Sequence, residues 1–222
     1  MKKTDHASTP YSILSNIPVI GQNNSVEETV LKSSRRGFLV TSTAALAGVI
    51  ASTSEADAGL FGYSSRPVNG IPESWVRLKG KNVYRYANFI KGLGLKNITP
   101  RMVLAPHFKK RGYVTNSLPP KSKWKKMGTT LKVVDRMSSE MGRPVSSIIS
   151  AYRSPRYNYA VGGKSSSQHI DNQALDVTFH GASPYYAARV AKYLRSKRKF
   201  SGGVGTYSSF VHIDTRGHNV SW

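Results

Sequence analysis

Residues 203–214 read Gly-Val-Gly-Thr-Tyr-Ser-Ser-Phe-Val-His-Ile-Asp, and this stretch predicts the last two strands of a sheet. One strand is expected at 202–207 and the other at 210–214. Because side chains alternate between the two faces of a strand, His212 and Asp214 project from one side, and the valine and isoleucine next to them face the opposite layer. The final strand therefore combines a buried apolar face with a polar face.

Outward from this stretch, two further strands are predicted at 145–151 and 174–179. A helix is expected at 129–141, where apolar residues recur at helical spacing, and another at 183–197, with Ser183 as its N-cap. The residues of the second helix expected to face inward are Tyr186, Val190, Tyr193 and Leu194. Helices that flank a small, mainly antiparallel sheet make an α+β fold.

Composition excludes several classes of protein. The chain has 222 residues, 33 Lys and Arg against 11 Asp and Glu, and no cysteine. Without cysteine there is no disulfide scaffold, no thiolate zinc finger and no cysteine nucleophile. Any metal must be bound by nitrogen and oxygen atoms.

The N-terminal part differs from the rest in charge and pattern. Basic and acidic residues balance within 1–58, so the whole formal net charge of +22 belongs to the remainder. Within this part, Arg35-Arg36, an apolar run and a small-residue stretch ending in Ala-Asp-Ala resemble a bacterial twin-arginine (Tat) export signal. A short buried helix with a chance arginine pair is the alternative. Export would require the Tat translocase as a partner and would place the protein in the periplasm or cell envelope.

Three segments are expected. Residues 1–58 form a polar leader plus the signal peptide, 59–124 a linker and basic N-terminal region of the exported part, and 125–222 the folded core. Within the second segment, residues 74–92 mix aromatic and basic side chains without a clean period, which fits short strands or a helix.

Three residues form a candidate metal-binding set. His169 lies in a predicted loop, while Asp176 and His212 lie in predicted strands. Two imidazoles and one carboxylate leave one position open, as catalytic zinc requires for a bound water. Asp176 is flanked by apolar residues, and a buried carboxylate needs a cation nearby. The alternative interpretation is that Asp176 pairs with an arginine or caps a loop and that the histidines are ordinary surface residues.

The order of motifs resembles a known family. Ser-Ala-Tyr-Arg-Ser-Pro at 150–155 is followed by Ser-Gln-His at 167–169, Asp176, Gly-Val-Gly at 203–205 and Val-His-Ile-Asp at 211–214. This arrangement resembles the LAS-type zinc peptidases, which include D-alanyl-D-alanine carboxypeptidases, vancomycin-resistance dipeptidases and murein endopeptidases. The likeness covers roughly 125–222 and is strongest to twin-arginine-exported murein endopeptidases. It implies a hedgehog/DD-peptidase-like fold.

The resemblance also implies roles for individual residues. His169, Asp176 and His212 would bind Zn²⁺. Arg153 would hold the substrate or stabilise the oxyanion, a role that suits its planar donor fork, or it could form a surface ion pair instead. Ser167 would lie beside the substrate backbone, or its hydroxyl could simply order the loop.

One position departs from the family pattern. Many relatives place Glu or Asp three residues before the last zinc histidine as general base, and here Ser209 occupies that position. A serine hydroxyl does not accept a proton near neutral pH. Asp214 is the nearest carboxylate on the same strand face, so it would either serve as the base or orient a metal ligand.

Three functions are compared on these grounds. The first is a zinc peptidase that cuts peptidoglycan peptides as an endopeptidase or a carboxypeptidase. The second is a catalytically inactive, zinc-bearing cell-wall-binding module, which Ser209 favours. The third is a basic nucleic-acid binder with a contact strip at 121–126, but export and the lack of a nucleic-acid motif argue against it. The positive charge predicts attraction to peptidoglycan and to anionic envelope surfaces through basic patches.

Overall fold

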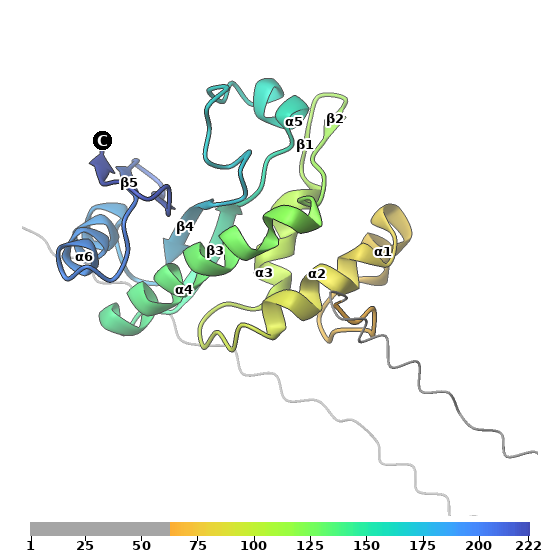
Figure 1. Ribbon diagram of the computed structural model, residues 1–222, viewed down its shortest axis with the longest axis horizontal. Helices are drawn as coiled ribbons and strands as arrows, with labels where there is room; N and C mark the ends of the chain where they lie inside the picture. Colours follow the sequence, from red (N-terminus) through yellow and green to blue (C-terminus); the bar gives the residue numbers. More distant parts are fainter. Residues whose placement is uncertain (1–62) are drawn as a thin grey trace, which may run out of the picture. The chain divides into compact units, whose positions relative to one another are not determined.

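The structure is a computed structural model that describes residues 63–222 (Figure 1). The predicted leader and signal peptide, residues 1–58, lie outside the described residues. The α-helices are α1 (Glu73–Lys79), α2 (Asn82–Lys91), α3 (Pro100–Leu104), α4 (Trp124–Met141), α5 (Pro155–Ala160) and α6 (Pro184–Ser196). The strands are β1 (Lys110–Arg111), β2 (Val114–Thr115), β3 (Val145–Ser150), β4 (Ala174–Phe179), β5 (Gly203–Thr206), β6 (Val211–Asp214) and β7 (Val220–Ser221). No helix in the described range has the length and apolar character needed to cross a membrane.

A five-stranded sheet of order β3-β4-β6-β5-β7 forms the centre of the fold. Its strands pair antiparallel except for β7, which runs parallel to β5. The short strands β1 and β2 form a separate antiparallel hairpin. This architecture confirms the predicted α+β class with a mainly antiparallel sheet.

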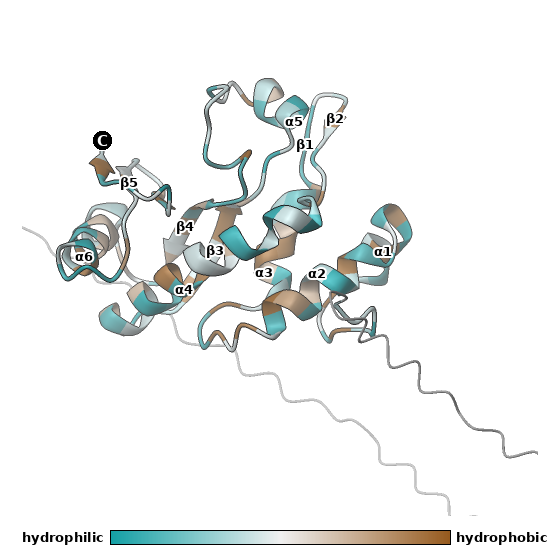
Figure 2. Ribbon diagram, in the orientation of Figure 1, coloured by the Kyte–Doolittle hydropathy of each residue, from teal (hydrophilic) through white to brown (hydrophobic). Residues whose placement is uncertain are grey.

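One hydrophobic core joins the helices before residue 125 to the sheet. Helix α2 buries Val83, Tyr86 and Ile90 in the same cluster as Leu131 of α4 and Ile213 of β6. Hydrophobic residues gather where α2, α3 and α4 meet the sheet (Figure 2). Residues 74–92, which show no clean hydrophobic period, form most of α1 and all of α2.

Helix α4 begins five residues before the predicted start, at Trp124. The basic segment 121–126 is therefore a 3₁₀ turn followed by the first turn of α4. Trp124 is buried, and its indole N–H donates to the carbonyl oxygen of Pro119 at 3.0 Å. At its other end α4 stops at Gly142, whose left-handed backbone (φ 59°) suits glycine.

Helix α6 begins as predicted, because the Ser183 hydroxyl accepts a hydrogen bond from the backbone N–H of Tyr186 at 3.1 Å. The prediction that Tyr186 and Tyr193 face inward was wrong, since both are exposed. Small residues fill the buried face instead and let the helix lie close to the sheet: Ala187, Ala188 and Ala191, together with Leu194. The tyrosines consequently lie on the outer side of the helix.

Candidate metal centre

Strands β4 and β6 bring two of the predicted ligands together. In their antiparallel register Asp176 lies directly opposite His212, so both side chains occupy the same face of the sheet. The neighbouring residues Leu175 and Ile213 also pair, and both are completely buried in the core on the other face. The alternation predicted for the last strand is therefore present in both strands.

His169 reaches this face from the turn-rich segment before β4. Its carbonyl oxygen accepts hydrogen bonds from the backbone N–H groups of Arg153 (3.1 Å) and Asn172 (3.2 Å). Its imidazole Nδ1–H donates to the carbonyl oxygen of Ala151 at 2.7 Å. The loop is thus fixed to the chain that follows β3, and the His169 ring is buried.

The three side chains converge on one centre. His169 Nε2 lies 3.3 Å from Asp176 Oδ1, and His212 Nδ1 lies 2.8 Å from the same oxygen. One ligand atom from each residue lies within 4.8 Å of the other two. Nitrogen and oxygen donors of this kind, without cysteine, suit zinc and related divalent ions.

The hydrogen bonds that the two imidazoles make on the side away from the shared centre show whether the site fits a metal ion. A carbonyl oxygen can only accept, so the Ala151 contact places the proton of His169 on Nδ1 and leaves the Nε2 lone pair facing Asp176. His212 lies between two carboxylates, with Nε2 3.0 Å from Asp214 Oδ2 and Nδ1 2.8 Å from Asp176 Oδ1. In the tautomer with its proton on Nε2, which donates to Asp214, the Nδ1 lone pair faces Asp176. Acceptors then face one another, an arrangement that a cation between them would stabilise. The residues fit a metal ion.

The pKa values reflect the same crowding of charge. Burial would raise the pKa of Asp176, but the two nearby histidines outweigh burial and hold it well below its usual range. Burial lowers the pKa of His169. For His212, hydrogen bonds to Asp176 and Asp214 outweigh burial and raise the pKa. The pocket therefore keeps its carboxylate ionised and favours positive charge beside it.

Asp214 is completely buried and its carboxylate is saturated with donors. Oδ1 accepts from the Gly203 N–H (2.9 Å), the Arg216 N–H (3.2 Å) and Arg216 Nε (2.8 Å). Oδ2 accepts from His212 and from Arg216 Nη2 at 2.5 Å. Although burial opposes it, these donors lower the pKa of Asp214. This geometry suits an acceptor that orients His212 better than a base that takes up protons.

Arg153 contacts the candidate ligand Asp176 itself. Its Nη2 donates to Asp176 Oδ2 at 2.7 Å, and its Nε donates to the Ser150 hydroxyl at 2.8 Å. The pairing of Asp176 with an arginine, which the sequence offered as an alternative to metal binding, thus occurs together with the histidine cluster. One carboxylate oxygen faces Arg153 and the other faces the two histidines.

An open cavity of about 760 Å³ adjoins the cluster. Arg153, Ser167 and all three candidate ligands line it. The remaining walls include cationic and aromatic side chains: Lys164, Arg216, Tyr207, Phe210 and Trp222. Asp176 is the single carboxylate in this lining, which consists of described residues.

Trp222 is a wall residue whose position the sequence does not predict. Its ring centroid lies 5.2 Å from that of His212, and its indole N–H donates to the Tyr207 hydroxyl at 3.0 Å. A Cβ on Gly205 would come within 2.6 Å of the indole. Glycine in the middle of β5 is the signal in the sequence, because it marks a close approach by another group.

Four further polar residues, among them Ser209, lie outside the cavity. His107 is buried against Tyr86 and Tyr152, and Ser209 and His218 are exposed. Asp171 forms an ion pair with Lys123 at 3.1 Å. The structure therefore brings together Arg153, Ser167 and the three candidate ligands, with Asp214 behind them.

Comparison with known proteins agrees with this geometry. No curated protein and no solved structure matches this chain. The Peptidase M15 family matches residues 102–214, from α3 to the end of β6. This match begins earlier than the resemblance read from the sequence and includes Arg153, Ser167 and all three candidate ligands. The chain belongs to the Peptidase M15 family.

Proposed function

We propose that this protein is a zinc-dependent peptidase that hydrolyses peptide bonds in peptidoglycan, as a murein endopeptidase or a D,D-carboxypeptidase. The observation that carries the proposal is the convergence of His169 Nε2, Asp176 Oδ1 and His212 Nδ1 at the wall of an open cavity. The outer acceptor Ala151 holds the His169 ring with its Nε2 lone pair toward the shared centre, and Asp214 accepts from His212 Nε2 in the tautomer that leaves Nδ1 to a metal.

Each residue at the site has its own proposed role in the reaction. A zinc ion bound by the three ligands would polarise the scissile carbonyl and lower the pKa of a bound water toward neutrality. Arg153 holds Oδ2 of Asp176, the oxygen that does not face the histidines, and its Nη1 has no partner within residues 63–222. Because Arg153 lines the cavity, we assign this group the binding of a substrate carbonyl or carboxylate oxygen. Ser167 lines the same wall and offers a hydroxyl to the substrate backbone.

The charge of the cavity supports an acidic substrate. Arg153, Lys164 and Arg216 line it, and its one carboxylate is already engaged with Arg153 and the histidines. The stem peptides of peptidoglycan carry several carboxylates, so such a cavity would attract them. Export through the twin-arginine signal at Arg35-Arg36 would bring the protein to this substrate in the periplasm or cell envelope.

A second function, a zinc-bearing wall-binding module without catalysis, is favoured by one observation. Of the described carboxylates only Asp176 lines the cavity, and Asp214 is enclosed by its own donors. Ser209, at the position of the family base, is exposed outside the cavity. Such a module would bind the wall and release nothing.

The test is incubation of the full chain with purified sacculi, with and without a metal chelator, followed by mass analysis of released fragments. We expect muropeptide release that the chelator abolishes and added zinc restores. The variant His169→Ala should bind no zinc and release nothing, while His218→Ala, at an exposed histidine, should behave as wild type. Binding to sacculi without release in the zinc-loaded protein would support the binding module instead.

A further inference from the structure

The outer face of α6 combines exposed tyrosines with cations. Tyr185 and Tyr193 expose 69% and 54% of their surface. Arg189 and Lys192 lie between them in the helix and are also exposed. Tyrosine rings left in water on a helix whose inner face is filled by alanines have no role in the core. We call Tyr185, Tyr186, Arg189, Lys192 and Tyr193 the α6 face.

The charge on this part of the chain is of one sign. Between Asp176 and Asp214 the sequence contains no acidic residue. The turn that follows α6 adds three exposed cations, Lys197, Arg198 and Lys199. Arg195 is engaged in the fold, because it donates to Val220 and Ser221 of β7. Neither the cations of the α6 face nor those of the turn form an ion pair within the described residues.

The positive surface continues onto α4. Lys199 and Phe200 line a cavity of about 430 Å³ together with Lys125, Lys132 and Arg136 of α4. These three α4 residues lie on one side of the helix by their spacing. The floor of this cavity is apolar and includes Phe89 and Leu194. A broad cationic surface with exposed rings and an apolar recess therefore surrounds the end of α6.

From this combination we propose that the α6 face and the adjoining turn dock on an anionic phospholipid surface. Lysine and arginine attract the phosphate groups of the lipids. Tyrosine lies at the level of the headgroups, with its ring toward the acyl chains and its hydroxyl in water. A convex helix face suits a planar surface. Single-stranded nucleic acid is usually bound in a groove. None of the residues of the α6 face lines the cavities of about 430, 500 and 760 Å³, although Lys199 of the adjoining turn lines the first of them.

The sheet would keep docking separate from the metal centre. Helix α6 packs on β5 and β6, on the side to which Val211 and Ile213 point, whereas His212 points to the other side. A protein docked through α6 would therefore hold its cavity away from the lipid. This inference does not depend on the proposed peptidase activity.

The test is co-sedimentation of the full chain with vesicles, either of phosphatidylcholine alone or of equal parts phosphatidylcholine and phosphatidylglycerol. Pure phosphatidylcholine measures attachment that does not depend on charge. We expect Arg189→Gln with Lys192→Gln to weaken binding to the anionic vesicles by about 30-fold, because each cation near such a surface contributes about fivefold. Adding Tyr193→Ala should weaken it further.

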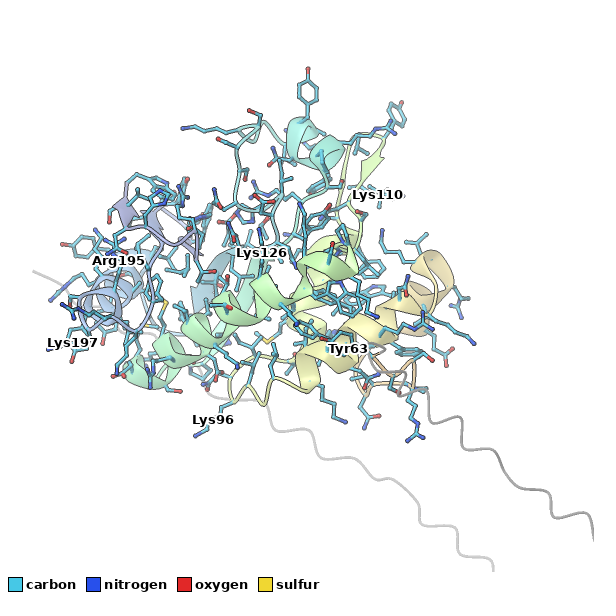
Figure 3. The ribbon with its side chains drawn as sticks, viewed as in Figure 1. Tyr63, Lys96, Lys110, Lys126, Arg195 and Lys197 are labelled. Atoms are coloured by element: carbon cyan, nitrogen blue, oxygen red, sulfur yellow. The ribbon has the colours of Figure 1, made fainter. Side chains whose placement is uncertain are left out.

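The hairpin of β1 and β2 supplies a matched control. Lys110→Gln, Arg111→Gln and Tyr113→Ala remove the same charges and the same ring from an exposed site. Figure 3 labels Lys110 and, at the end of α6, Lys197 on opposite sides of the molecule. The control should bind within about threefold of wild type. Circular dichroism and thermal midpoints check that all variants are folded. If the triple variant is unfolded, the double variant that keeps Tyr193 is compared with the control instead.

Three results would overturn the proposal. Equal losses in the α6 and hairpin variants would mean that net charge alone drives binding. If the α6 variants bind vesicles as strongly as wild type, the α6 face does not contact the lipid. Loss of binding to a single-stranded oligonucleotide with vesicle binding intact would assign the face to nucleic acid.

Discussion

Asp214→Asn is the substitution that separates orientation from proton transfer at the metal centre. Asparagine keeps the size of the side chain but presents one oxygen and one NH₂ group. Three donors converge on Oδ1 of Asp214, so the remaining oxygen should stay there. The NH₂ group then takes the place of Oδ2, opposite both His212 Nε2 and Arg216 Nη2. Because two donors cannot face each other, the His212 proton should move to Nδ1, the atom that faces Asp176.

The expected loss of zinc affinity is 10- to 100-fold, the usual effect of removing an outer partner of a metal-binding histidine. It corresponds to about 1.4 to 2.7 kcal/mol. Titration against a competing chelator at pH 7 measures the affinity, and turnover of muropeptides at saturating zinc measures the chemistry. We expect turnover to recover to within about tenfold of wild type once zinc saturates the site.

Asp171→Asn is the matched control, since among residues 63–222 this carboxylate pairs with Lys123 and with no histidine. Its zinc affinity should equal that of wild type. Unchanged zinc affinity in Asp214→Asn, together with turnover lost by more than about a hundredfold at saturating zinc, would refute the orienting role. Asp214 would then be the proton acceptor.

Three further predictions concern stability and the cavity wall. Burial lowers the pKa of His107 to about 4 from 6.5, so the unfolded chain takes up a proton between these pH values that the native state refuses. Between pH 6.5 and 4 the unfolding free energy of wild type should therefore fall by about 3 kcal/mol more than that of His107→Phe. Urea titrations across this pH range measure the difference, and equal pH slopes for the two proteins would contradict the prediction. Lys79, Tyr86 and Tyr152 are the ionisable groups beside the His107 ring. Leu131→Ala removes a fully buried side chain and should lower the unfolding free energy by about 2 to 5 kcal/mol, which denaturant titration measures. Gly205→Ala should push the Trp222 indole out of the cavity wall and change the tryptophan emission, and an unaltered spectrum would mean that the wall accommodates the methyl group.

The sequence predicted the cluster of candidate metal ligands and the two strands that carry Asp176 and His212, because their signals are local. Strand β4 was expected at its observed bounds, since an apolar run with a single aspartate is typical of a buried strand that carries a functional group. The ordered histidines and aspartate then indicated the same face of the sheet. Ser183 and the proline after it similarly marked the start of α6.

Other features depend on contacts that the sequence does not reveal. The tyrosines of α6 look like core residues by spacing, but alanines fill the buried face and the rings remain outside. Strand β7 has two residues and depends on hydrogen bonds from Arg195, which lies far from it in sequence. Helix α1 buries no residue, so its sequence has no apolar period that would predict a helix. The cavity wall depends on Trp222 meeting Gly205 across two strands.

The position of β6 in the sheet has a consequence for synthesis. β6 lies between β4 and β5, yet every helix and most other strands precede it in the chain. During synthesis from the N-terminus, β4 is therefore made before its neighbour β6. Until β6 follows, one edge of β4 is unpaired, and Leu175 and Val177 are exposed to water. Nascent chains and truncated products that stop before residue 211 should need chaperones to stay soluble.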